Sequence, residues 1–266
     1  FGVERVFDIP LSENAVTGVA LGLGMSGLRP VMNHQRADFS FTSMEQIVNQ
    51  VSKLTYTTGN RMTPKMTLRM VVGRGWGQGP THAQSPHGLY ASIPGLAVLA
   101  PATPNDGYWL TRDAIESDEA VVIIEHRWLH QISGDVDYEN RPLRSNEAEV
   151  LISGRDLVLI SMSYGVIECL KIEKILNSVG IKASVINLRS VSPIDSNTIL
   201  EEVKKTRRAV IFDTSHIHFG VASEISALIH ENLLEHLLKP CMRIGNLFQP
   251  APSAPFLAKK YYPDIR

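Results

Sequence analysis

Short apolar runs alternate along this chain with segments that have helical character. Residues 66–72 and 120–125 are apolar runs of strand length, and residues 93–101 give a turn followed by a third such run. The run at 120–125 is almost entirely apolar, as expected for a parallel strand that is buried on both faces. Apolar positions in residues 44–53 recur at helical spacing, and a second helix is predicted at residues 105–117.

The alternation resumes after residues 131–149, which are polar, have little periodicity and are predicted to be a linker. Strands that alternate with helices indicate a parallel sheet with right-handed crossovers. The predicted fold class is therefore α/β, with parallel-sheet domains at residues 1–130 and 150–266. In the second domain the predicted strands are residues 156–162, 182–188 and 209–213, and the predicted helices are residues 166–179, 197–205 and 220–231.

The start of the chain combines a turn with a helix rich in small residues. Arg5–Phe7 is predicted to end a strand, and Pro10 biases the residue before it away from the helical region. Ser12 can act as an N-cap, and Glu13 falls in the first turn, where the helix dipole favours a negative charge. Residues 15–23 are mostly small and apolar and include Gly18 and Gly22, which disfavour a helix unless another element packs closely against it. On this local pattern alone, Glu13 is most simply a solvated first-turn acid.

Composition and charge exclude several classes of function. A chain of 266 residues is long enough for two domains, and its formal net charge of −1 gives no electrostatic basis for binding nucleic acid or anionic membranes. No run approaches the roughly 18 apolar residues that a membrane span needs. Cys169 and Cys241 have no metal-ligand spacing, which favours a reducing, intracellular compartment. Residues Phe1–Glu4 resemble neither an initiator end nor a signal peptide.

Two glycine-rich segments suggest nucleotide binding, but their context argues against it. Residues 22–27 (GLGMSG) match the dinucleotide pattern, yet they lie within and at the end of a predicted helix. The loop at residues 73–80 has no following Gly-Lys-Ser/Thr, which excludes a P-loop. His216 and His218 follow a predicted strand, but no third ligand is recognisable, so a metal site there is weakly supported.

Several segments resemble one enzyme family. Residues 5–30 (RVFDIPLSENAVTGVALGLGMSGLRP), 81–86 (THAQSP, where the family has HSQS) and 93–101 are similar to the β subunits of thiamine-diphosphate-dependent 2-oxo acid dehydrogenases. These E1-component subunits are related to transketolase. The resemblance implies a transketolase-like pyrimidine-binding domain at residues 1–130 and a transketolase C-terminal domain at residues 150–266. It also implies a helical segment ahead of residue 1.

The resemblance implies roles for four side chains. Glu13 matches the glutamate that hydrogen-bonds the cofactor's aminopyrimidine ring and promotes proton loss at C2, and burial of such a carboxylate raises its pKa. Phe39 matches the aromatic residue that stacks on the pyrimidine, although it could equally be a core anchor. His82 matches the catalytic histidine that manages protons during acyl transfer, the alternative being a surface-loop histidine. Tyr56 matches a position near the cofactor pocket.

The loop after the predicted strand at residues 30–32 adds candidates for substrate contact, namely His34, Arg36 and Asp38. Arg36 also departs from the residues common in pyruvate-type relatives, as does Asn33. The predicted function is oxidative decarboxylation of a pyruvate-like 2-oxo acid with acyl transfer to lipoamide. An acetoin-cleaving enzyme, or another thiamine diphosphate enzyme that is not coupled to lipoamide, is an alternative. Alternatives from other classes of function are a catalytically silent scaffold subunit and a nucleotide-binding electron-transfer subunit.

Partners and ions follow from the same resemblance. The chain has Gly134-Asp135-Val136 in place of the Gly-Asp-Gly motif with which family partners hold magnesium. A separate α subunit is therefore expected to bind the diphosphate of thiamine diphosphate with Mg²⁺, in an α2β2 heterotetramer. A lipoyl-bearing E2 is a further expected partner, and the expected location is the cytoplasm, or the mitochondrial matrix in a eukaryote. Some relatives hold potassium on main-chain carbonyls, and the matching residues are Met66, Ala114, Ile115, Ser117 and Glu119.

Overall fold

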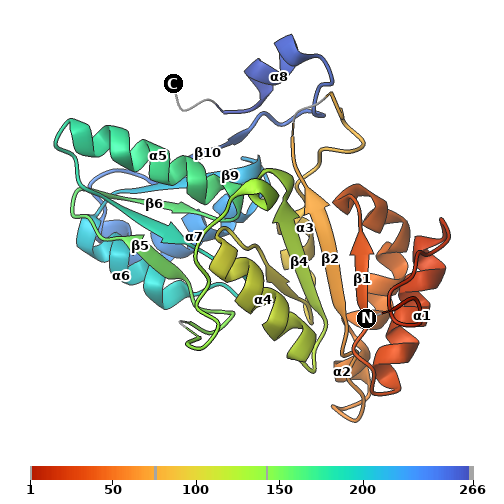
Figure 1. Ribbon diagram of the computed structural model, residues 1–266. Coiled ribbons are helices and arrows are strands. Elements are labelled where there is room, and N and C mark those ends of the chain that lie inside the picture. The colour runs from red at the N-terminus through yellow and green to blue at the C-terminus, as the bar shows by residue number, and fades with distance from the viewer. Residues whose placement is uncertain (1, 75–76, 142, 264–266) are drawn as a thin grey trace.

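Two sheets organise the molecule and lie side by side (Figure 1). The computed structural model describes residues 2–74, 77–141 and 143–263. Over these residues the strand orders are β1-β2-β4-β3-β8 and β10-β9-β6-β7-β5. The first sheet contains β1 (Val31–His34), β2 (Thr67–Val72), β3 (Ala97–Leu99), β4 (Val121–His126) and β8 (Ser190–Ser192). The second contains β5 (Glu149–Ile152), β6 (Leu157–Ser161), β7 (Ala183–Asn187), β9 (Ala209–His216) and β10 (Met242–Asn246).

Strand pairs are parallel except at one edge of each sheet, where β8 and β5 run antiparallel to their neighbours. The predicted α/β class with two mostly parallel sheets is therefore confirmed. The strand β8 comes from the second half of the chain but pairs with β3, where Ser192 lies opposite Val98. The pairing of β8 with β3 connects the second half of the chain to the first sheet. A three-residue strand has no readable period, so the sequence pattern does not reveal it.

Helices pack against both sheets, and the central strand β4 is buried among them. Its residues Val122, Ile123 and Ile124 have no exposed surface, as expected for a parallel strand that is covered on both faces. The α-helices are α1 (Glu13–Met25), α2 (Leu54–Thr57), α3 (His87–Ala91), α4 (Pro104–Glu116), α5 (Tyr164–Ser178), α6 (Ser196–Thr206), α7 (Val221–Leu233) and α8 (Pro255–Tyr261). Shorter helical segments are η1 (Ala37–Ser43), η2 (Gln46–Val51), η3 (Arg127–Gln131) and η4 (Leu234–His236).

Two predicted elements differ in the structure. Arg5–Phe7 forms a turn and not a strand, because two successive amides there donate to the carbonyl of Gly2 at 3.1 and 3.0 Å. Val6 and Phe7, the apolar residues of this segment, pair with no strand among the described residues. The helix predicted at residues 44–53 is present, but Gln46–Val51 is wound as a π-helix, with the wider i to i+5 bonding. Apolar spacing alone does not distinguish these windings.

The glycine-rich face of α1 packs closely against other elements, as its composition predicts. A Cβ atom on Gly24 would lie 1.8 Å from the carbonyl oxygen of Pro64, and one on Gly18 would lie 3.2 Å from Oε1 of Gln46. Gly22, in the same helix, has no such atom within 4 Å. Close packing at the middle and at the C-terminal end of α1 therefore fixes the helix that begins at Glu13.

We expect Gly24→Ala to destabilise the protein by about 1–3 kcal/mol, because the added methyl group overlaps a main-chain oxygen that cannot move cheaply. The matched control is Gly22→Ala, which meets no neighbour and gains up to about 1 kcal/mol of helix propensity. Urea unfolding of both variants measures the difference. Equal free energies of unfolding for the two variants would contradict the close packing.

A buried ion pair connects the two halves of the chain. Arg189 follows β7 and is 1% exposed, and its Nε donates to Oδ1 of Asp106 at 2.7 Å. Asp106 lies in the first turn of α4, where its Oδ2 accepts from the amide of Thr103 at 3.2 Å in a capping box. Nη1 of Arg189 also donates to the carbonyls of Arg144 and Glu147, both at 2.8 Å. These bonds hold the start of α4 against the end of the predicted linker.

Candidate active site

The carboxyl ends of β1, β2 and β4 lie side by side at one end of the first sheet (Figure 1). Each strand leads into a segment with candidate residues: β1 into η1, β2 into the loop that carries His82, and β4 into η3. Helix α1 packs beside η1. Ligands in open parallel sheets bind at this end of the strands. Of the predicted loop at residues 73–80, Gly75 and Trp76 lie outside the described residues.

Glu13 is the first residue of α1 and is half-buried. Its Oε2 lies 3.3 Å from the hydroxyl of Thr42 in η1, and the same hydroxyl lies 2.8 Å from the carbonyl oxygen of Phe39. One hydroxyl proton can serve only one of these oxygens at a time, and a carboxylate has about four acceptor positions. The Glu13 carboxylate therefore retains capacity for a ligand. Ser12 occupies the predicted N-cap position, but its side chain makes no capping hydrogen bond.

Phe39 and His82 meet between η1 and the loop after β2. Their ring centroids are 5.4 Å apart and the rings are nearly perpendicular, at 88°. Phe39 keeps 36% of its surface exposed, so a flat ring can still stack on it. Nδ1 of His82 lies 2.9 Å from the Thr81 hydroxyl. When that hydroxyl donates to Nδ1, the ring proton of a neutral His82 is on Nε2.

His34 ends β1 and is buried beneath this site. It is 3% exposed, and burial lowers its pKa to about 4, although the charge of Glu13 acts in the opposite direction. Its Nε2 has no hydrogen-bond partner among the described residues. His34 therefore does not offer the open ring that substrate contact requires.

Asp38 connects η1 to the loop that carries His82. Its Oδ1 accepts a hydrogen bond from Nε2 of Gln84 at 2.8 Å. Burial raises the pKa of Asp38, while this bond and the charge of His82 oppose the rise. The bond fixes the position of Phe39 relative to His82, because the two rings sit on the segments that it joins.

Tyr56 is the one predicted cofactor residue that the structure does not bring to this cluster. It lies on α2 and is 88% exposed. Figure 1 shows α2 at the opposite end of the first sheet from the carboxyl ends of β1 and β2. Glu13, Phe39 and His82 thus converge, whereas Tyr56 lies apart from them.

Two of the carbonyls predicted to hold potassium are engaged by an arginine. Nη1 of Arg29 donates to the carbonyl oxygen of Ile115 at 3.1 Å and also to that of Ser117. The carbonyl of Met66 accepts from the amide of Val121 at 3.0 Å. A guanidinium therefore already supplies positive charge where the ion would. The predicted set does not fit a potassium ion in this arrangement, and no step of the chemistry is derived through one.

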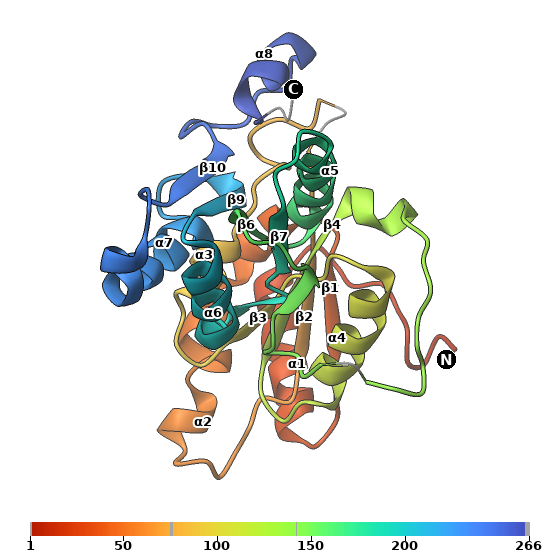
Figure 2. The ribbon, with the colours of Figure 1, turned by 90° about the vertical axis from the view of Figure 1, so that its left-hand side faces the viewer.

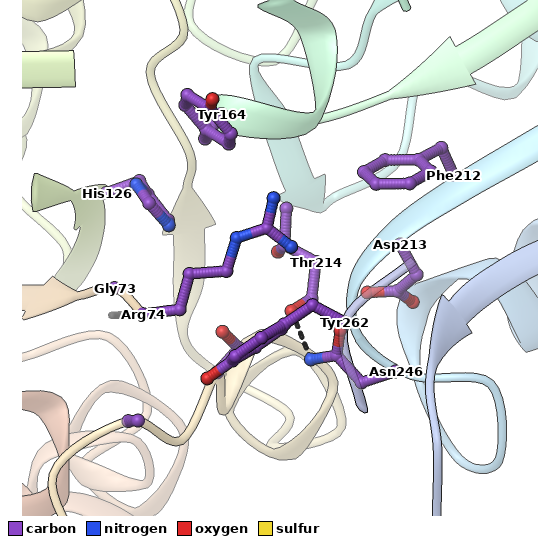
Figure 3. A pocket seen from close by; sticks show the side chains of 11 residues that line it. Gly73, Arg74, His126, Tyr164, Phe212, Asp213, Thr214, Asn246 and Tyr262 are labelled. Carbon is purple, nitrogen blue, oxygen red and sulfur yellow. Dashed lines mark hydrogen bonds between the residues drawn. The ribbon is translucent and has the colours of Figure 1, made fainter. Parts of the chain in front are cut away.

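A small pocket lies behind the loop that carries His82 (Figure 3). Its volume of about 20 Å³ is that of a site for roughly one water molecule. The pocket lies where the ends of β2, β4 and β9 approach one another. Its lining consists of Gly73, Arg74, Ala83, Ser85, His126, Tyr164, Phe212, Asp213, Thr214, Asn246 and Tyr262.

The side chain of Arg74 occupies the middle of this pocket (Figure 3). Its guanidinium carbon lies 4.8 Å from the ring centroid of Tyr262, 5.1 Å from that of Trp128 and 5.8 Å from that of Tyr164. Such cation–π contacts stabilise a cation within about 6 Å of an aromatic ring. Burial, with the charge of Arg74, lowers the pKa of His126 to about 3. The sequence pattern missed this cluster because its members come from separate segments.

The loop after β2 also meets the C-terminal segment (Figure 2). Ala83 packs with Ala251 and Tyr261, the latter in α8. Nε2 of His216 lies 3.0 Å from the Tyr261 hydroxyl, a contact that uses one of the two histidines considered for a metal. In residues 2–74, 77–141 and 143–263, no group of three or more His, Cys, Asp or Glu side chains could hold a metal ion. No helix within those ranges is long and apolar enough to cross a membrane.

Comparison with known proteins identifies the family. Residues 1–131 match the transketolase pyrimidine binding domain, and residues 146–266 match the transketolase C-terminal domain. The chain is 37% identical to the pyruvate dehydrogenase E1 component subunit beta of Bacillus subtilis, over 92% of this chain and 76% of that protein. The chain belongs to the 2-oxo acid dehydrogenase E1 β-subunit family. The two matches leave residues 132–145 between them, inside the predicted linker.

Other relatives differ in their reactions. The chain is 33% identical to the acetoin:2,6-dichlorophenolindophenol oxidoreductase subunit beta of B. subtilis, over 99% of this chain and 77% of that protein. It is 32% identical to the 2-oxoisovalerate dehydrogenase subunit beta of the same organism, over 98% of this chain and 80% of that protein. A split gene transketolase, solved as an inactive beta4 tetramer, has a TM-score of 0.77 at 22% identity, over 97% of this chain and 79% of that one. This likeness shows the transketolase-like fold.

Proposed function

We propose that this E1 β-family chain supplies the pyrimidine half of a thiamine diphosphate site in a 2-oxo acid dehydrogenase. The observation that carries the proposal is the convergence of Glu13, Phe39 and His82 at the carboxyl ends of the first sheet. These residues fit the cofactor. A half-buried carboxylate with acceptor capacity suits the aminopyrimidine, and a partly exposed phenyl ring suits stacking on it.

Each side chain has a definable task. Bound thiamine diphosphate supplies the nucleophilic carbon and the electron sink for decarboxylation. Glu13 holds a hydrogen bond to the aminopyrimidine ring and exchanges a proton there. Phe39 orients the ring by stacking, and Thr42 and Asp38 keep both elements in place. His82 is positioned by Thr81 to give or take a proton at Nε2 during decarboxylation or acyl transfer to lipoamide.

We further propose an α subunit as the obligatory partner. Apolar side chains close to Glu13 in the sequence are exposed, among them Phe7 at 67%, Leu11 at 96% and Val19 at 62%. Exposed apolar surface of this kind is typical of a protein–protein contact. The described residues provide no side-chain cluster for a divalent cation. The α subunit would therefore bring the Mg²⁺ and diphosphate site in an α2β2 assembly, with a lipoyl-bearing E2 as acyl acceptor. We place the assembly in the cytoplasm, or in the mitochondrial matrix in a eukaryote.

The proposal is tested by thiamine diphosphate titration of this chain with and without its α subunit. Tight binding and release of CO₂ from a 2-oxo acid are expected only for the complex, because this chain holds only the pyrimidine half. A panel of pyruvate, 2-oxobutyrate, 2-oxoisovalerate and acetoin then separates a 2-oxo acid dehydrogenase from an acetoin-cleaving enzyme. A complex that binds no thiamine diphosphate would refute the proposal.

A further inference from the structure

Two arginines converge beside His82 on one neutral oxygen atom. Arg36 immediately precedes η1 after β1, and Arg127 begins η3 after β4, so they flank the end of β2 from both sides. When the Gln78 side-chain amide, in the loop after β2, is oriented to satisfy its hydrogen bonds, its oxygen accepts from Nη2 of Arg36 and, at 3.3 Å, from Nη1 of Arg127. The amide nitrogen of Gln78 donates to the main-chain carbonyl of His82 at 3.1 Å.

Two like charges meet at this arginine pair, because the charge of Arg127 acts on Arg36. Asp38 is the acid that acts on Arg36, and its own hydrogen bond goes to Gln84. Glu125, on β4, accepts a hydrogen bond from Nε of Arg69 at 2.8 Å and lies 2.9 Å from Nε2 of His130. Burial and the charge of Arg127 both lower the pKa of Arg36. Two guanidinium groups held together on a neutral amide oxygen form a site that suits an anion.

The carboxylate that leaves as CO₂ is a poor candidate for this anion. Its negative charge passes to the rest of the molecule as the carbon–carbon bond breaks. Cations fixed on it would stabilise the ground state more than the transition state and would slow decarboxylation. An anionic group that the product retains keeps its charge throughout the reaction, so cations bound to it do not slow decarboxylation in this way. Binding such a group raises the specificity for substrates that carry it.

We propose that Arg36 and Arg127 bind a second anionic group, a carboxylate or a phosphate, at the far end of the 2-oxo acid substrate. The oxygen of this group takes the place of the Gln78 oxygen between the two guanidinium groups. The inference rests on the proposed function and narrows its substrate to 2-oxo acids with an anionic tail. Both arginines are half-buried, so part of each residue remains exposed.

The test compares substrates that differ in the charge of their tail. The enzyme is the complete complex with its α subunit, and the rate is measured by CO₂ release. The substrates are 2-oxoglutarate, with a carboxylate tail, 2-oxo-4-phosphonobutanoate, with a phosphonate tail, and 2-oxohexanoate, with an uncharged tail of similar length. We expect a higher kcat/KM for one of the two anionic tails than for 2-oxohexanoate, and the better one identifies the chemistry. Arg36→Gln and Arg127→Gln are each expected to lower the anionic-to-uncharged ratio at least about tenfold. The matched control is Arg155→Gln, at a residue whose side chain is 80% exposed in the second domain.

The outcomes separate this inference from the function on which it rests. A wild-type complex that prefers 2-oxohexanoate overturns the inference while supporting the proposed function. Variants that lose activity equally on charged and uncharged tails also overturn it, since that pattern indicates misfolding or general damage. A complex that binds no thiamine diphosphate and releases CO₂ from none of the acids overturns both. A selective drop in the ratio for both arginine variants, with none for Arg155→Gln, supports it.

Discussion

Glu13→Gln is expected to lower the turnover of the assembled enzyme by about 10²–10⁴-fold, the contribution typical of a positioned acid–base group. An amide can still hydrogen-bond to the aminopyrimidine, but it cannot exchange a proton with it. The fold should be unaffected, because the side chain is half-exposed and its described hydrogen bond is a 3.3 Å contact with Thr42. Thiamine diphosphate affinity should change far less than turnover. CO₂ release at saturating cofactor, together with a cofactor titration, measures the two effects separately.

The matched control is Glu231→Gln, which makes the same change on the exposed end of α7, far along the chain from the site. It should retain full turnover. Urea unfolding of both variants should give free energies within about 0.5 kcal/mol of the wild type. Near-normal turnover of Glu13→Gln would remove Glu13 from the chemistry and leave it as a first-turn acid.

Asp106→Ala is expected to destabilise the protein by about 3–5 kcal/mol, the typical cost of removing one partner of a buried ion pair. The variant would leave the Arg189 guanidinium, which is 1% exposed, without its carboxylate. It would also remove the acceptor for the amide of Thr103 and for Nδ2 of Asn187, at 3.2 and 2.8 Å. Chemical denaturation of the chain measures the loss, with thermal unfolding as a second reading.

The matched control is Glu116→Ala, which removes an acid from the other end of α4. Glu116 pairs with Arg112 at 2.9 Å, but both side chains are exposed, so the expected change is only about 0–1 kcal/mol. Similar losses for the two variants would mean that burial does not decide the strength of the Asp106–Arg189 pair. A large loss for Asp106→Ala alone would establish the pair as the tie between α4 and the second half of the chain.

The architecture was largely readable from the sequence. The strand predicted at residues 120–125 is β4 at Val121–His126, and the helix predicted at residues 105–117 is α4 at Pro104–Glu116. Apolar runs and helical spacing each indicate one buried element. The alternation of such strands and helices along the chain is typical of a parallel sheet. Elements without a local signal were missed. The strand β8 has three residues, and η1 holds its shape by contacts with α1, so tertiary contacts decide both.

The site residues came from the resemblance, and the structure sorted them by position. Glu13, Phe39 and His82 converge, with Thr42 as an unpredicted link. The roles of these residues stay predictions until the variants are measured. Tyr56, by contrast, is on α2, which Figure 1 shows at the other end of the sheet. A matched motif fixes which residue is present, but it does not fix which way a short helix turns its side chains.

By itself, the sequence determined the two α/β units, the glycine-rich helix that must be closely packed, and the family. These properties depend on residues near one another in the chain, where period and spacing can be read directly. Only the tertiary structure decided that Arg36 and Arg127 meet at Gln78, that Arg29 reaches the carbonyls of residues 115 and 117, and that Asp106 finds Arg189. Those contacts join residues 42 to 88 positions apart. Their geometry depends on how the strands are ordered in the sheets, and no local pattern records that order.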